Sequence, residues 1–149
     1  MIQTPHTYSE WVNILLVFKD RTNDSEVITA MQAGTIEWQT GVAERFSKKL
    51  IDAVNFRMNT ATDRFQKEIS RSQGREGDIV QAILSLRKEF IFLAKAIDLP
   101  ALPQREREHY TRLVYEQADS IQQSLEDSAR KDRSGKMSSI IRNHKVNSF

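Results

Sequence analysis

The chain contains no cysteine among its 149 residues. This absence excludes disulfides, thiol nucleophiles and thiolate metal sites, and it agrees with a reducing compartment. Glycine and proline are scarce, at 5 and 3 residues, which excludes a long flexible linker or a collagen-like segment. No apolar run approaches the roughly 20 residues that a membrane helix needs, and the first residues lack the basic start and apolar centre of a signal peptide. We therefore expect a cytoplasmic protein that contacts no membrane.

Apolar residues at helical spacing are what the chain has in abundance. They make up 39% of the sequence against 28% charged residues, a balance typical of a globular protein of one domain, which usually has about 100–200 residues. The most apolar stretch runs from Ile79 to Leu99, and its large residues recur at three- and four-residue steps, which places them on one face of a helix. We expect this stretch to be the central helix of an all-α bundle, with Phe90 and Leu93 in the core.

Two short helices are predicted before residue 42. Thr7 and Glu10 have the spacing of a capping box, which opens the first helix. Asp24 or Ser25 then caps the second. Gly34 suits the left-handed position that ends a helix.

Three long helices are predicted after them. The first covers 42–71, the central helix begins near 76, and Pro103 is well placed to open the last, which Gly135 stops. Trp38, between the short and the long helices, is expected to plug the end of the bundle. The fold class is therefore all-α: an elongated bundle of about five helices, two short at the N-terminal end and three long.

The charges divide the chain into a body and a tail. Residues 1–135 carry 19 basic and 20 acidic residues, whereas 136–149 carry three basic residues and no acid. We predict one helical-bundle domain over 1–135 and a basic tail over 136–149, which is a flexible end, a short docking helix or an arm passed to a neighbour. Because the tail has few apolar residues, we expect its deletion to leave the folded body intact.

Candidate catalytic and metal-binding residues are sparse. Glu106 and His109 have the Glu-x-x-His spacing of di-iron bundles, but the other two histidines, His6 and His144, have no glutamate three residues before them. No glycine-rich phosphate loop is present either. We predict a protein that is not an enzyme and has no cofactor, and we keep a metal-binding helical protein as the weakest alternative.

The segment 25–50 suggests a second class of function, a small nucleic-acid-binding regulator. It reads as two helices joined at a glycine, with Ala30 and Gly34 spaced as in many helix-turn-helix units, although Thr40 stands where the second helix would want an aliphatic residue. Candidate phosphate contacts are the basic residues of this segment and of the tail. They are Arg45, Lys48, Lys49, Lys136, Arg142 and Lys145.

A second apolar stripe on the central helix favours protein–protein association. Val80, Leu84 and Ile91 fall beside the main core stripe, and apolar surface that one bundle cannot cover marks an interface. The helix over 42–71 is also long for a compact domain of this size, because about thirty residues span roughly 45 Å. We therefore predict a non-enzymatic interaction or scaffold protein that associates with itself as a two-fold dimer, or with another protein. Glutamate at Leu84 and Ile91 should split such a dimer.

Overall fold

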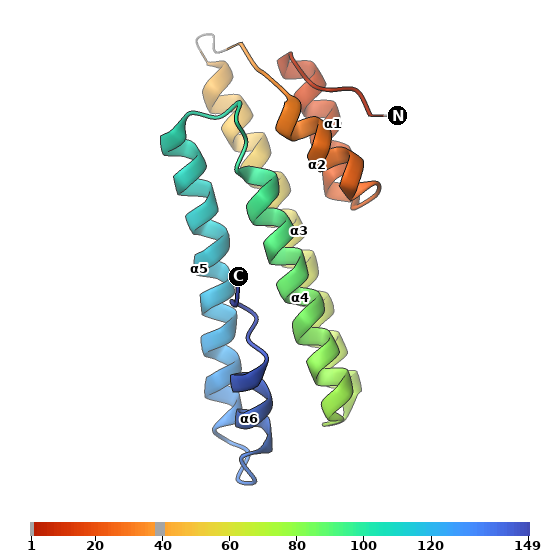
Figure 1. Ribbon diagram of the computed structural model, residues 1–149, viewed down its shortest axis with the longest axis vertical. Helices are drawn as coiled ribbons and strands as arrows, with labels where there is room; N and C mark the ends of the chain where they lie inside the picture. Colours follow the sequence, from red (N-terminus) through yellow and green to blue (C-terminus); the bar gives the residue numbers. More distant parts are fainter. Residues whose placement is uncertain (1, 38–40) are drawn as a thin grey trace. The chain divides into compact units, whose positions relative to one another are not determined.

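A computed structural model of the chain describes residues 2–37 and 41–149, and the described residues form six α-helices and no strand (Figure 1). The all-α fold class is thus confirmed, with three long helices packed together and one helix more than expected. The helices are α1 (Tyr8–Asp20), α2 (Asp24–Ala33), α3 (Val42–Ser72), α4 (Glu76–Ile97), α5 (Gln104–Ala129) and α6 (Lys136–Asn143).

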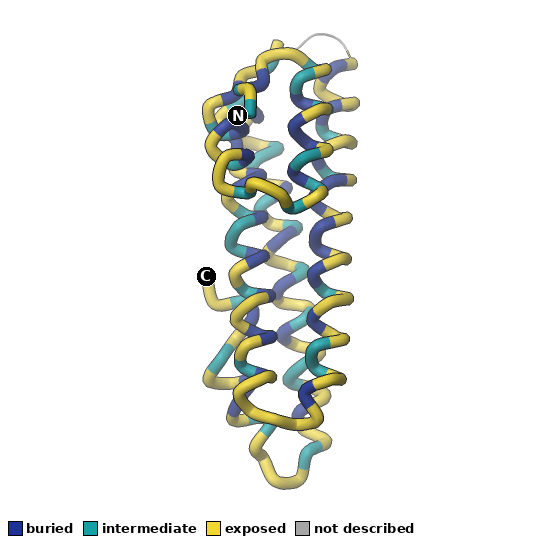
Figure 2. The backbone as a smooth tube through the Cα atoms, turned by 90° about the vertical axis from the view of Figure 1, so that its right-hand side faces the viewer, coloured by how far each residue is buried: buried dark blue, intermediate teal, exposed yellow. Residues whose placement is uncertain are grey.

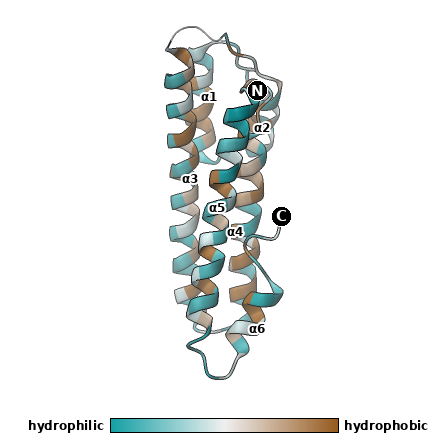
Figure 3. Cartoon of the chain, turned by 90° about the vertical axis from the view of Figure 1, so that its left-hand side faces the viewer, coloured by the Kyte–Doolittle hydropathy of each residue, from teal (hydrophilic) through white to brown (hydrophobic). Residues whose placement is uncertain are grey.

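The described chain divides into two compact units, and each long helix contributes a segment to both. Unit 1 comprises residues 1–58 and 93–111, and unit 2 comprises 59–92 and 112–149. Each turn of α3, α4 and α5 has buried and exposed positions (Figure 2), and hydrophobic and hydrophilic residues repeat along these helices in the same way (Figure 3). This is the pattern of helices that each bury one face. Phe90 of unit 2 and Leu93 of unit 1 are fully buried, as predicted.

The N-terminal end of unit 1 is held by a helix cap and by a tryptophan. The Glu10 amide donates to Thr7 Oγ1 and the Glu10 carboxylate accepts from the Thr7 amide, so the predicted capping box is present. The Trp11 ring packs edge-on against Phe46 of α3, with centroids 5.1 Å apart. Its indole N–H donates to the Thr35 carbonyl at 2.7 Å, which satisfies the one polar group of the buried ring.

A fully buried arginine also stabilises unit 1. The Arg57 guanidinium donates two parallel hydrogen bonds of 3.0 Å to the Asp24 carboxylate and a third, of 2.9 Å, to the Phe18 carbonyl. Its carbon Cζ also lies 4.7 Å from the centre of the Phe18 ring. Charge pairing and hydrogen bonds offset the large cost of removing this cation from water.

Unit 2 contains the sixth helix, which the sequence interpretation treated as part of the tail. Ile140, Ile141 and Val146 are buried, so the basic residues 136–149 form a short docked helix and its extension. Deletion of 136–149 would uncover the apolar surface beneath these three side chains, so the reason for expecting an intact body after truncation, that the tail contributes few apolar groups, does not hold. The last long helix ends at Ala129, and Gly135, with a φ of 75°, precedes α6 instead of stopping α5.

Two other local predictions need correction. Gly34 does not adopt the left-handed conformation, because its φ is −70° and its ψ is 159°. Glycine is required there for space, since a Cβ at this position would lie 2.6 Å from Trp11 Cζ2. Asn23, in place of Asp24 or Ser25, precedes α2, and its side chain makes no capping hydrogen bond.

Trp38 lies outside the described residues. Among the described helices, none combines the length and the apolar character needed to cross a membrane.

Candidate interaction surfaces

A groove in unit 2 is lined by residues of α3 and α5. It encloses about 360 Å³. Its floor is apolar, and its walls carry small hydroxyl side chains and one amide. The floor residues are Phe65, Ile69, Ile121 and Leu125, and the wall residues are Thr62, Gln66, Ser70, Ser120, Ser124 and Ser128.

The walls of this groove, which we call the α3/α5 groove, follow one pattern on both helices. On each helix the wall residues recur at every fourth position, so they form one row along the axis. Small side chains in such rows allow another helix to approach closely. Among the described residues that line the groove, none carries a formal charge, although charged residues make up 28% of the chain. Depletion of charge is what distinguishes the core of a protein interface from ordinary surface.

The apolar stripe predicted as an interface lies on α4 in unit 2. Leu84 is 36% exposed, and Val80 and Ile91 are half-buried. Arg87 belongs to the same face, because these four positions fall within roughly 60° on a helix of 3.6 residues per turn. Its Nε donates to the Lys145 carbonyl at 2.7 Å. The chain's own C-terminal segment therefore reaches this face, and the role of the stripe in association stays a prediction.

The basic residues predicted to contact nucleic acid fall into two groups. Arg45, Lys48 and Lys49 are exposed on the first turns of α3 in unit 1, and the Arg45 guanidinium lies 5.1 Å from the centre of the Tyr8 ring. Those of the tail are exposed in unit 2, at Lys136, Arg142 and Lys145. Eight residues, 34–41, separate α2 from α3, whereas a helix-turn-helix joins its helices with a turn of about 3–4 residues. The described helices α2 and α3 are therefore farther apart in the sequence than the two helices of that motif, and contact with nucleic acid stays a prediction.

The Glu-x-x-His pair lies at the start of α5. His109 is exposed, and its ring contacts the neighbouring Tyr110 ring at a centroid distance of 5.5 Å. Glu106 is half-buried one turn earlier. Within the described part of the chain, no three His, Asp or Glu side chains gather in a way that could hold a metal ion, so the structure adds no third ligand to this pair.

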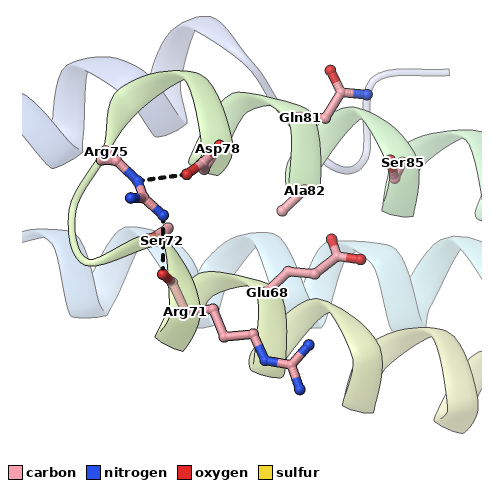
Figure 4. A pocket seen from close by; sticks show the side chains of 8 residues that line it. All are labelled: Glu68, Arg71, Ser72, Arg75, Asp78, Gln81, Ala82 and Ser85. Atoms are coloured by element: carbon pink, nitrogen blue, oxygen red, sulfur yellow. Dashed lines mark hydrogen bonds and ion pairs between the residues drawn. The ribbon is translucent and has the colours of Figure 1, made fainter.

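A polar hollow of about 280 Å³ lies where α3 turns into α4 (Figure 4). Arg75 points toward Asp78 and donates to its carboxylate at 2.7 Å, and it also reaches the Arg71 carbonyl at 3.4 Å. Glu68 and Asp78 balance the two arginines among the lining residues. Because Arg75 already pairs with Asp78, and Glu68 offsets the charge of Arg71 without an ion pair between them, the hollow offers little net charge to an external ion, and we interpret it as a local brace of the turn.

Sequence reasoning missed the α3/α5 groove, although a signal for it exists. Uncharged polar residues at 62, 66 and 70 and at 120, 124 and 128 depart from the usual expectation that the exposed face of a helix is rich in charge. From the sequence alone, this periodicity predicts one uncharged face on α3 and one on α5. Only the fold shows that the two faces adjoin, because the rows are separated by about fifty residues of sequence.

Comparison of the chain with protein-family models, with curated proteins and with solved structures finds no match.

Proposed function

We propose that this protein is a non-enzymatic, self-associating helical scaffold, and that two copies associate through the α3/α5 groove. One observation carries the proposal: the groove combines an apolar floor with uncharged walls. Burying such a surface removes apolar area from water without the cost of desolvating a charge. Helix-in-groove association uses surfaces of this kind.

A second copy of the chain fits the groove better than an unrelated charged partner. Under a two-fold axis the same surface meets itself, so residue i of one copy contacts residue j of the other and the surface must be complementary to itself. The wall residues satisfy this condition, because hydroxyl and amide side chains can each donate and accept hydrogen bonds. Rows spaced by four residues on both helices also interdigitate when two helices cross.

Sedimentation equilibrium of the whole chain tests the proposal. We expect a concentration-dependent mass that reaches twice that of the chain. Ser124→Arg places a long cation on the exposed groove wall and should weaken association by at least about ten-fold, equivalent to about 1.4 kcal/mol. Gln123→Arg is the matched control, because this neighbouring residue is exposed on the same helix and does not line the groove.

Two results would contradict the proposal. One is a wild-type protein that stays monomeric at tens of micromolar. The other is a dimer that Ser124→Arg and Gln123→Arg weaken equally. If Leu84→Glu with Ile91→Glu alone splits the dimer, the contact lies on the α4 stripe and not in the groove.

A further inference from the structure

The C-terminal segment of unit 2 is anchored to the chain by few side chains and several main-chain atoms. We call residues 136–149 the arm. Three buried apolar side chains seat it, Ile140, Ile141 and Val146. Near its end, Asn147 donates to the Asp119 carboxylate at 2.8 Å, and the Phe149 ring lies 5.0 Å from that of Tyr115.

Side chains of the surface beneath the arm form hydrogen bonds with the backbone of the arm. The buried Gln122 side chain accepts from the Val146 amide at 2.9 Å through Oε1, and its Nε2 donates to the Ile141 carbonyl at 3.5 Å. Arg87 donates to the Lys145 carbonyl from α4. We call Arg87, Asp119 and Gln122 the arm site. Since both copies of the chain have the same arm, these hydrogen bonds can be made whichever copy supplies it.

The loop between α5 and the arm is short and lies on the surface. None of its six residues, Arg130 to Gly135, is buried. The Asp132 carboxylate accepts from the Met137 amide at 3.1 Å and from the Ser134 hydroxyl at 2.9 Å, so the loop is closed by its own hydrogen bonds. Because none of its residues is buried, the loop can extend without uncovering a core, and a hinge ahead of a docked element is the arrangement from which copies exchange that element.

We propose that the arm site is an exchange surface, on which the arm of a second copy of this chain seats in place of the chain's own arm. The proposal rests on the self-association argued above and names a second, separate contact for it. Exchange preserves the contacts of the arm with Arg87, Asp119 and Gln122 in both copies, so the two forms differ in the hinge, including its Asp132–Met137 hydrogen bond, and in the entropy of association. Gln122 and Asp119 lie roughly 100° and 160° around the α5 axis from Ile121 of the α3/α5 groove. Both surfaces can therefore be occupied in the same assembly.

Single-cysteine variants provide the test, because the chain has no cysteine of its own. Asp119→Cys is placed in one preparation, and Asn147→Cys in a second that also carries a mass tag. The two are unfolded together, refolded and treated with a short bis-maleimide. An exchanged arm brings the two thiols together on different chains, and we expect a covalent heterodimer on the order of ten-fold more abundant than collisions produce. The collision control replaces Asn147→Cys by Ser139→Cys, which is exposed on α6 and takes no part in the Asn147–Asp119 contact.

The double variant Asp119→Cys with Asn147→Cys shows that the cross-linker spans the contact, since it must react within or between chains. Heterodimer yield equal to the Ser139→Cys control, with the double variant cross-linked only within one chain, overturns the exchange. If sedimentation then still shows a dimer that Ser124→Arg disrupts, the groove proposal stands and only the exchange has failed. A chain that is monomeric throughout and forms no heterodimer overturns both.

Discussion

Replacing Gly34 by alanine should destabilise the protein, although the backbone of this residue is ordinary. At φ −70° and ψ 159°, an alanine meets no conformational penalty. Its Cβ would, however, lie 2.6 Å from Trp11 Cζ2 and 3.0 Å from both the Cγ and the carbonyl oxygen of Pro5. These neighbours are not free to move, because the Pro5 carbonyl accepts from the Thr35 amide at 3.0 Å and the Trp11 indole is bonded to the Thr35 carbonyl.

Two opposing effects set the magnitude for Gly34→Ala. Overpacking of a dense core costs about 1–3 kcal/mol, while the reduced freedom of the unfolded chain returns about 0.4–1 kcal/mol. We expect a net loss of about 1 kcal/mol in the free energy of unfolding, or about 2–4 °C in Tm for a chain of this size. Gly77→Ala is the matched control, because nothing lies within 4 Å of its added Cβ. In the first turn of α4 it should stabilise the protein by about 0.5–1 kcal/mol.

Urea unfolding followed by circular dichroism measures both variants against the unmodified chain. The expected result is a change of opposite sign at the two glycines. If Gly34→Ala raises the midpoint as Gly77→Ala does, the contact of Trp11 with residue 34 is loose, and the steric explanation for this glycine is refuted.

Three further predictions concern the core and the charges. Phe90→Ala should lower the free energy of unfolding by about 3–5 kcal/mol; a loss below about 1 kcal/mol in urea would show that this ring is peripheral. Asp24→Ala should cost about 3 kcal/mol because it removes the carboxylate that pairs with the buried Arg57 cation; the double variant with Arg57→Met should regain much of that stability, as measured by thermal melting. The hydrogen bond from the Met137 amide is the main cause that lowers the pKa of Asp132. The ionised Asp132 carboxylate therefore contributes its full stabilisation above about pH 4 and loses it as the pH falls further. Asp132→Asn should make the free energy of unfolding less dependent on pH in this acidic range.

The parts of the fold that depend on local pattern could be predicted from the sequence. The long apolar repeat predicts the helix that contains Phe90, and the Thr7–Glu10 spacing predicts the cap that α1 has. Both signals work because every partner lies within a few residues along the chain. The start of α4 at Glu76 follows in the same way from the glycine-containing turn before it.

What the sequence did not reveal depends on contacts between distant residues. The arm has only a few apolar residues, too few for a periodic signal, and its docking relies on Gln122, which lies 24 residues from Val146, and on Arg87, which lies 58 residues from Lys145. A glutamine in mid-helix looks like ordinary surface until the fold buries it. Gly34 was misread for a related reason, since its constraint comes from Trp11, 23 residues earlier.

The way the arm is bound also determines which of its residues can be substituted without releasing it. Gln122 and Arg87 hold it through two backbone carbonyls, which every residue has, and one backbone N–H, which every residue except proline has. Only three of its apolar side chains are buried. Lys136, Arg142 and Lys145 point their side chains into solvent. A library that randomises these three positions should keep the arm docked, whereas proline at Val146 should release it. The positive charge of the arm thus does not contribute to its docking, and selection can change that charge while the arm stays docked.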